Sequence, residues 1–422
     1  MKQLLFPCFL LVALACVCIA STSEEFFFGC PAFESILDQR TASRVTEGNQ
    51  LVLLTNGSAY IETFFALLES AEHHVNLQTF IFLVDSMGSQ VLEILQKKAE
   101  QGIPCRLLFD PIGVLQKKKS YLLSLNAPHF SLRAFSRQPF QIGASNYIAH
   151  EKILEVDSRV ALVGGANVDE VNALGYSSSQ AWSRGVNQAP HLDMNFLVRG
   201  PAVAEIQSVF FQTWNHIGLA EEPFHELPME PAATPGSARV RVIHQQPYLS
   251  RDLPFRDVMI LAIETAQDSI DIQTPFFSPY PYELYQALIR AAQRGVQVRI
   301  LTNSRQTCDR KHVYDSGRYY YDEIVSAGVQ IFEYQAQFFH GKAALFDGVY
   351  AVVGSANVNV RSLYFDGEIV VAVEDPGFAQ DLTLFFSEAL AFSQLVSREE
   401  LERESFFVNQ VQKICSSFAW LN

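Results

Sequence analysis

The chain has 422 residues, which is enough for two or three domain-sized units. Its content of 49% hydrophobic and 18% charged residues is typical of a globular, somewhat apolar protein. The formal net charge of −14 argues weakly against a nucleic-acid-binding protein, because phosphate backbones reward Lys and Arg, but it leaves room for a local basic pocket.

The first segment of the chain is apolar. Residues 4–20 follow Lys2, and small residues stand just before Ser21. This pattern predicts a secretory signal peptide over residues 1–20, with a retained membrane anchor as the alternative. We therefore expect a protein that is secreted, periplasmic or membrane-associated through this segment. Four cysteines lie outside it without C-x-x-C spacing, which favours isolated thiols over a zinc site; they are Cys30, Cys105, Cys308 and Cys415.

From residue 45 onward, helix-type and strand-type patterns alternate, which predicts an α/β fold with helical crossovers. In the first part we expect helices over 58–71 and 88–101 and strands over 75–82 and 103–110. Residues 216–238 contain four prolines without hydrophobic periodicity and predict a linker. The alternation then resumes, with expected strands over 240–244, 269–275 and 296–302 and expected helices over 256–266 and 282–294.

The two parts of the chain are an internal repeat. Residues 71–79 match residues 266–274, and the helix end at 99–102 matches 292–295. The period is close to 190 residues, which is far too long for a solenoid. The repeat predicts two pseudo-equivalent α/β halves, over residues 45–215 and 239–395, followed by a helical tail over residues 396–422.

Each half contains one copy of a polar motif with the spacing H-x-K-x4-D. The second copy is His340, Lys342 and Asp347, and the pattern of residues 339–346 predicts a strand on which the imidazole and the ammonium share a face. Ser355 and Asn357 follow and also suit an anionic site. The first copy lies 190 residues earlier, and its members are His150, Lys152, Asp157 and Asn167. A chance match with the same offset at both the histidines and the asparagines would be unusual, so the two copies predict one site that is built twice.

A carboxylate follows each motif at a matched position. Asp193 lies eight residues before Pro201, and Glu368 lies eight residues before Pro376. This correspondence predicts that the two carboxylates support the motif histidines. An aromatic pair nine residues after each proline is expected in the core; the pairs are Phe210 with Phe211 and Phe385 with Phe386.

These motifs resemble those of the phospholipase D superfamily. The tract from Gly354 to Ser362 that leads to Glu368, together with residues 273–279, is most similar to the bacterial cardiolipin synthase and phosphatidyltransferase branch. The resemblance spans residues 45–395 and implies two halves, each a mixed β-sheet flanked by helices, with the active site at their interface. Cardiolipin synthases of this branch usually have two membrane helices before the catalytic region, whereas this chain has one leader-like segment.

The resemblance also implies residue roles. One histidine forms a covalent phosphohistidine, and the other protonates the leaving alcohol and then activates water or an alcohol. His150 is favoured as the nucleophile by analogy with the amino-terminal histidine of the family. Asp193 is expected to orient His150, and Glu368 to orient His340. Phosphate oxygens would be bound by a larger set, which is Lys152, Asn167, Lys342, Ser355 and Asn357.

The two motif aspartates belong to the catalytic motif, but a structural role in pinning nearby backbone is favoured for Asp157 and Asp347. We expect neither a metal nor another cofactor. A phospholipid at a membrane surface is the expected substrate, nucleic acid is the less favoured one, and the duplication makes an oligomer unnecessary for a complete site.

Three functions remain open from the sequence. The first is a phospholipase D or a cardiolipin synthase-like transphosphatidylase, and the second is a secreted or luminal nuclease of the same superfamily. The third, a silent binding protein, is disfavoured because both motifs are complete. The long step from Asn167 to Asp193 is interpreted either as a rim loop over residues 175–190 or as a plain surface loop. The apolar stripe in the tail, which includes Phe407, Ile414 and Phe418, is expected to pack on the domain, with membrane contact as the alternative.

Overall fold

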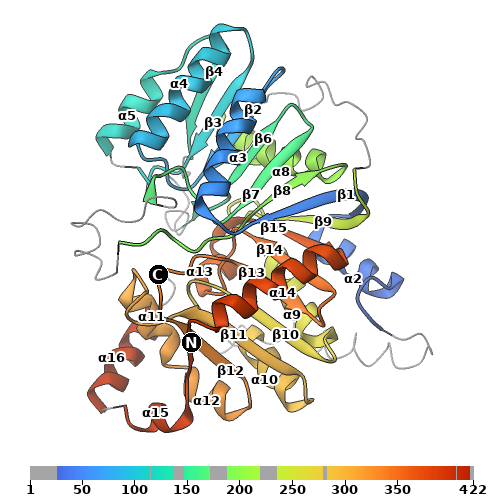
Figure 1. The fold of residues 1–422 in the computed structure, drawn as a ribbon, viewed down its shortest axis with the longest axis vertical. Coiled ribbons are helices and arrows are strands. Elements are labelled where there is room, and N and C mark those ends of the chain that lie inside the picture. The colour runs from blue at the N-terminus through green and yellow to red at the C-terminus, as the bar shows by residue number, and fades with distance from the viewer. Residues whose placement is uncertain are drawn as a thin grey trace.

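A mixed 16-stranded β-sheet runs through both halves of the chain in the computed structural model (Figure 1). The structure describes residues 26–114, 116–135, 147–171, 188–218, 235–278, 283–404 and 406–418. The expected leader, most of the linker and most of the 175–190 loop lie outside these residues. The predicted alternation of strands and helices is confirmed, with differences of a few residues at element ends.

The strands of the first half follow one order across the sheet. From the middle of the molecule outward they are β1 (Val45–Leu54), β8 (Asn195–Arg199), β7 (Val160–Gly164), β6 (Ile153–Val156), β2 (Val75–Thr79), β3 (Cys105–Phe109) and β4 (Phe130–Ala134). The outer three strands are parallel, and the inner ones pair antiparallel.

The second half repeats this order. Its strands are β9 (Ala238–Gln245), β15 (Asp366–Glu374), β14 (Tyr350–Gly354), β13 (Ala343–Phe346), β10 (Ser269–Gln273), β11 (Gln297–Asn303) and β12 (Gln330–Tyr334), with β16 (Ser393–Leu395) added at the edge. The two halves join where β1 pairs antiparallel with β9. The predicted repeat is therefore a repeat of topology, and equivalent strands lie at equivalent distances from the junction.

Helices cover both faces of each half. In the first half, α3 (Gly57–Ser70) and α4 (Ser86–Glu100) share a core with β2, β3 and β6. In the second half, α9 (Pro254–Thr265) and α10 (Glu283–Gln293) share a core with β10 and β11. α8 (Ala202–His216) and α14 (Pro376–Leu390) pack into one core with the inner strands of both halves. This shared core fixes the halves against each other.

Local sequence explains where these helices begin. The Asn56 side chain accepts a hydrogen bond from the backbone of Ser58 at the start of α3, and Asp85 accepts one from Gly88 at the start of α4. Asp375 does the same for α14, which has Pro376 in its first turn. Side chains of this type satisfy amide groups that have no partner inside the helix. The predicted aromatic pairs of α8 and α14 are buried, as expected.

Smaller helices complete the described part of the chain. They are α2 (Pro31–Thr41), α5 (Gln116–Ser124), α11 (Lys311–Arg318), α12 (Tyr321–Ser326), α13 (Val360–Tyr364), α15 (Arg398–Glu402) and α16 (Phe406–Ser417). None of the helices in the described residues is both long enough and apolar enough to span a bilayer.

The tail helix α16 packs on α11, but with the opposite face to the expected one. Its buried residues are the polar Gln412 and Ser416, whereas Phe407, Ile414 and Phe418 are 76%, 60% and 53% exposed. The prediction that the apolar stripe packs on the domain is wrong. Local hydrogen bonds satisfy these buried polar residues, because Gln412 donates to Glu404 and Ser416 donates to the carbonyl of Lys413.

Candidate active site

Two segments, each of which pairs with the opposite half of the chain, bring the motifs together at the junction of the halves. The short strand β5 (Ile148–Ala149) pairs in parallel with the start of β15, and the backbone amide of His150 donates to the carbonyl of Gly367 at 2.9 Å. In the second motif, the backbone amide of His340 donates to the carbonyl of Leu192 in the first half at 2.7 Å. Each motif histidine therefore lies along the carboxylate-bearing segment of the other half.

This crossing pairs each imidazole with the carboxylate of the opposite half. Nδ1 of His150 lies 3.0 and 3.1 Å from the two carboxylate oxygens of Glu368. Nδ1 of His340 lies 2.7 Å from Oδ2 of Asp193. The expected pairing of Asp193 with His150 and of Glu368 with His340 is wrong. The residues were identified correctly, but the crossovers exchange the partners.

The carboxylates also fix which ring nitrogen is available for chemistry. A carboxylate accepts from the protonated Nδ1, so that each imidazole presents Nε2 to the space beyond. Such an arrangement holds the ring in one tautomer and in one orientation. Both rings are thus prepared for nucleophilic or acid–base chemistry through Nε2.

The second motif does not lie on a strand as far as predicted. β13 begins at Ala343, and Phe339 forms only an isolated bridge to Leu192, so His340 and Lys342 lie in the crossover before the strand. Both lysines turn back toward their own motif. Nζ of Lys152 donates to the carbonyl of His150 at 2.5 Å, and Nζ of Lys342 donates to that of His340 at 2.6 Å.

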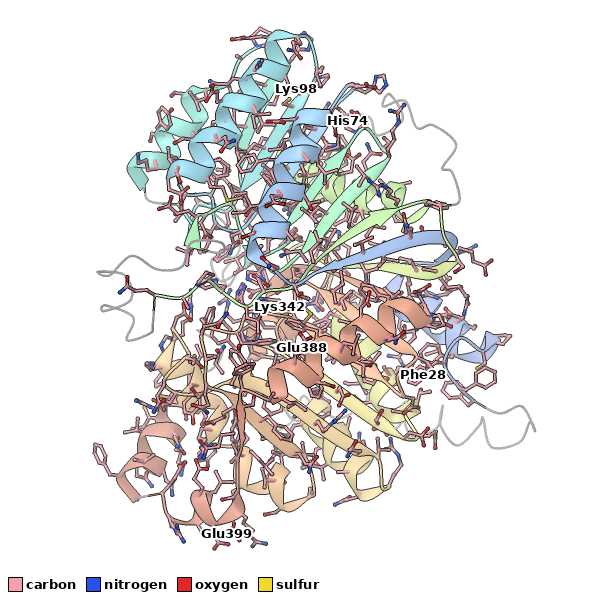
Figure 2. The ribbon with its side chains drawn as sticks, viewed as in Figure 1. Phe28, His74, Lys98, Lys342, Glu388 and Glu399 are labelled. Atoms are coloured by element: carbon pink, nitrogen blue, oxygen red, sulfur yellow. The ribbon has the colours of Figure 1, made fainter. Side chains whose placement is uncertain are left out.

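The two motifs form one electrostatic unit. Burial holds the pKa of His150 well below its usual value, and the charges of Lys152, Lys342 and His340 lower it further. Burial also lowers the pKa of Lys152 to about 7 and that of Lys342 to about 8, against the attraction of Glu368 and Asp193. Figure 2 shows Lys342 where the two halves meet.

These low pKa values indicate which ligand suits the site. A buried ammonium group without a nearby anion loses its proton easily, whereas a bound anion stabilises the charged form. Lys152 and Lys342, at 4% and 3% exposure, lie at one centre with two imidazoles and two carboxylates, so a bound anion there would stabilise the charged form of both lysines. A phosphodiester fits this demand, because its negative oxygens must be neutralised before a nucleophile can attack.

The two motif asparagines also lie at this centre. Asn167 and Asn357 are buried, at 7% and 6% exposure. Oδ1 of Asn167 accepts a hydrogen bond from the backbone of Ile81 at 3.1 Å, which fixes its side chain. Oδ1 of Asn357 has no hydrogen-bond partner among the described residues. Both placements stay compatible with the predicted role in phosphate binding.

The structure gives Ser355 a different role from the expected one. Its fully buried hydroxyl donates to Oε2 of Glu368, and the hydroxyl of Ser362 donates to Oε1 at 2.6 Å. Ser355 therefore positions the carboxylate that holds His150 and is not directed at a phosphate. Its counterpart is Gly165, where an added Cβ would come within 2.2 Å of Oδ1 of Asp193. A side chain at this position would therefore collide with Asp193.

The motif aspartates hold backbone. Asp157 accepts from the amides of Glu72, His73 and His74, and Asp347 accepts from those of Gln267, Asp268 and Ser269, all at 2.7–2.9 Å. Both have left-handed backbones, with φ of 58° and 51°. Asp157 thereby connects the end of β6 to the turn before β2, and Asp347 connects the end of β13 to the turn before β10. This geometry supports the structural role that was favoured for them.

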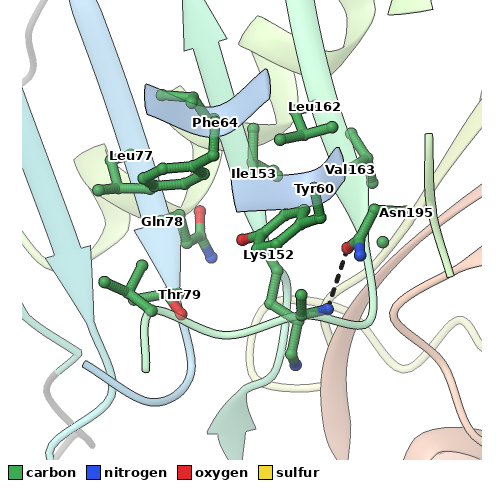
Figure 3. A pocket seen from close by; sticks show the side chains of 14 residues that line it. Tyr60, Phe64, Leu77, Gln78, Thr79, Lys152, Ile153, Leu162, Val163 and Asn195 are labelled. Carbon is green, nitrogen blue, oxygen red and sulfur yellow. Dashed lines mark hydrogen bonds between the residues drawn. The ribbon is translucent and has the colours of Figure 1, made fainter. Parts of the chain in front are cut away.

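Apolar and polar side chains surround the first motif. Phe80 lies against the ring of His150, with centroids 5.1 Å apart, and Nζ of Lys152 lies 5.6 Å from the same phenyl centroid. Lys152 also lines a pocket between α3 and the sheet, together with Tyr60, Gln78 and others (Figure 3). This environment excludes much of the solvent and strengthens electrostatic interactions at the site.

Sequence reasoning missed one residue of the site, His191. Its ring centroid lies 5.8 Å from that of His340 and 4.9 Å from that of Phe338. The signal that could have found it is its position two residues before Asp193, because residues i and i+2 of an extended segment share a side.

Comparisons with known proteins match both halves of the chain. The family model described as cardiolipin synthase, PLD-like domain, matches residues 64–214 and 259–390, which is one match in each half. A cardiolipin synthase of Geobacillus kaustophilus is 30% identical over 375 residues, covering 88% of this chain and 72% of that protein. Cardiolipin synthase A of Serratia proteamaculans is 26% identical, covering 92% and 79%.

Solved structures share the fold. The phosphatidylserine synthase of Haemophilus influenzae Rd KW20 superposes with a TM-score of 0.64 at 16% identity, covering 92% of this chain and 96% of that one. A polyphosphate kinase of Porphyromonas gingivalis superposes with a TM-score of 0.54 at 11% identity, covering 89% and 53%. At these identities the superpositions establish the duplicated fold alone.

Proposed function

Because the chain belongs to the cardiolipin synthase family of phospholipase D-like domains and is a phospholipase D-type transphosphatidylase, we propose that it transfers a phosphatidyl group to an alcohol through a phosphohistidine at His150. The observation that carries this proposal is the pair of crossed carboxylate–imidazole contacts, which prepares two Nε2 atoms at one anion-favouring centre.

The first half-reaction breaks the bond between phosphorus and the headgroup oxygen. Nε2 of His150 attacks phosphorus and forms a P–N bond, while the proton on Nε2 of His340 passes to the leaving alcohol oxygen. Lys152, Lys342, Asn167 and Asn357 would bind the non-bridging oxygens. The second half-reaction reverses these steps, because His340 takes the proton of an incoming hydroxyl whose oxygen displaces His150.

The two halves differ in a way that supports this division of roles. Burial, together with Lys152 and Lys342, holds the pKa of His150 well below its usual value and keeps the ring neutral and nucleophilic. Burial and Lys342 also lower the pKa of His340, but the charge of Asp193 and its hydrogen bond favour the protonated ring. Burial opposes ionisation of Asp193, but His340 holds its pKa below its usual range. The opposing effect of Asp193 on the lowered pKa of His340 supports the assignment of His340 as the proton carrier.

One experiment tests the substrate class. The purified full chain is incubated with phosphatidylglycerol vesicles, phosphatidylcholine vesicles and single-stranded oligonucleotides, with His150→Ala as the inactive control. We expect cardiolipin and free glycerol from the phosphatidylglycerol vesicles. Phosphatidic acid in place of cardiolipin would identify water as the acceptor and the chain as a hydrolase, and shortened oligonucleotides beside unchanged lipid would refute the proposal in favour of a nuclease.

We also propose that the exposed face of α16 contacts the bilayer that holds the substrate. A net charge of −14 repels anionic lipid, so attachment to a bilayer has to rely on apolar contacts. Changing Phe407, Ile414 and Phe418 together to Ser should weaken binding to neutral phosphatidylcholine vesicles by about 10-fold or more, since each side chain contributes on the order of 1 kcal/mol when buried. Cosedimentation measures the effect.

Leu384→Ser is the matched control for the tail variant. Leu384 is 56% exposed on α14, so its replacement removes one exposed apolar side chain from another helix. Equal binding by the tail variant and the unchanged chain would refute the role of α16.

A further inference from the structure

The residue between the histidine and the lysine differs between the two motifs. In the first motif it is Glu151, which is fully buried, and in the second motif it is Gly341. An added Cβ at Gly341 would lie 2.6 Å from Cε of Met194, so an apolar side chain fills this place in the second half. The motif can therefore be built without a carboxylate, and the burial of one in the first half calls for another explanation.

Side chains from both halves hold the carboxylate of Glu151. Its Oε1 lies 3.0 Å from Nε2 of His244 on β9 and accepts a hydrogen bond from the hydroxyl of Tyr248 at 3.4 Å. Nδ1 of His244 lies 3.2 Å from Oε1 of Gln212 on α8. Two acceptor oxygens thus face the two ring nitrogens, an arrangement in which a protonated imidazole donates to both. Burial and the charge of Glu151 raise the pKa of Tyr248 well above its usual value, so this hydroxyl keeps its proton and donates.

The same carboxylate packs on β15 beside the residue that holds His150. A Cβ at Gly367 would lie 2.9 and 3.1 Å from the two oxygens of Glu151, so a glycine leaves the carboxylate in this place. The carbonyl of Gly367 accepts from the backbone amide of His150, and the next residue, Glu368, holds the imidazole. β9, which carries His244, pairs with β15. The contact between Glu151 and His244 therefore joins the segment of His150 to both strands.

The second oxygen of this carboxylate has a different environment. Oε2 of Glu151 is enclosed and has no hydrogen-bond partner among the described residues. Burying a carboxylate with one oxygen unpaired destabilises a fold, because the lost hydration is not replaced. Fold stability therefore gives no reason for Glu151, and its place between His150 and Lys152 favours a role in the reaction.

We propose that Glu151 is a positioning residue, which His244 holds in place and which fixes the first motif against β15. This inference rests on the proposed phosphohistidine at His150. No bond to Glu151 forms or breaks in the reaction. Its loss should let the segment of His150 shift relative to Glu368, so that the attack on phosphorus slows while substrate binding is kept.

A donor with a nitrophenol leaving group tests the proposal, because its first turnover reports the attack of His150. Vesicles of phosphatidyl p-nitrophenol are mixed rapidly with the full chain, without an acceptor alcohol, and the rate constant and amplitude of the burst are recorded at several donor concentrations. Glu151→Ala and His244→Ala should each lower the rate constant about 10- to 100-fold, with the amplitude and the half-saturating donor concentration unchanged. The double variant should be no slower than either single variant, because both act through one contact. Glu151→Gln, which keeps an acceptor oxygen for His244, should restore most of the rate.

Glu155→Gln is the matched control, because Glu155 is also fully buried and its carboxylate lies 3.1 Å from Nε2 of His74. It should leave the rate constant unchanged, even where it lowers the amplitude by unfolding part of the protein. An unchanged rate constant in Glu151→Ala, with or without a loss of amplitude, would overturn the inference, and so would an equal slowing by Glu155→Gln. Absence of a burst from the unchanged chain would instead remove the proposed function and this inference with it.

Discussion

His150→Ala and His340→Ala are each expected to lower the turnover rate by about 10⁴-fold or more. The two variants should stop the reaction at different steps. A donor with a good leaving group, such as a phosphatidyl p-nitrophenol ester, separates the two steps because its departure needs no proton. His340→Ala should release one equivalent of nitrophenol in a burst and then stop. His150→Ala should release none, since it lacks the nucleophile.

The covalent product can be located directly. Mass spectrometry of the stalled His340→Ala protein should find the phosphatidyl group on the peptide that contains His150. His73→Ala is the matched control, because it removes an exposed imidazole and should turn over normally. A burst from His150→Ala together with an adduct on His340 would reverse the assignment of nucleophile and acid.

Much of the fold follows from the repeat in the sequence. The alternation of patterns predicted strands and helices that differ from the observed ones by a few residues, such as the expected helix over 58–71 and the observed α3 over Gly57–Ser70. The constant offset of 190 residues between His150 and His340 predicted equivalent halves, which the matching strand orders confirm. Local periodicity carries this information for helices such as α3 and α4, because each of them buries one face.

The pairing inside the site could not be read from spacing. Asp193 and Glu368 each follow the motif of their own half, so proximity in sequence suggested contact within a half. The observed exchange arises from β5 crossing to β15 and from the bridge between Leu192 and Phe339. These contacts depend on how the finished halves dock, and a single half contains no sign of them.

Chemistry that is specific to one half was also hidden by the repeat. Ser355 aligns with Gly165, and only the structure shows that the hydroxyl supports Glu368 while the glycine admits Asp193. His191 aligns with Asp366, so it carried no repeated pattern that would have singled it out. The departures from symmetry therefore point to the places where the two halves take different roles.

The crossed contacts lead to the second large expected effect. Glu368→Gln should slow the nitrophenol burst by roughly 10³-fold, because Glu368 holds the tautomer of the attacking His150. Asp193→Asn should leave the burst nearly intact and slow the later release of the phosphatidyl group by a similar factor, because Asp193 supports His340 as the proton acceptor. Rapid-mixing kinetics with the nitrophenyl donor measure both rates.

If each carboxylate were paired with the histidine of its own half, the two variants would show the opposite kinetic effects. In that case Asp193→Asn would suppress the burst and Glu368→Gln would trap the covalent protein, so the two kinetic phases distinguish the arrangements without ambiguity. Glu374→Gln serves as the control, since Glu374 lies at the far end of β15 and pairs with Arg239. A double variant of Glu368 and His150 should be no slower than His150→Ala alone, because a carboxylate that acts through an imidazole has no effect once the imidazole is gone.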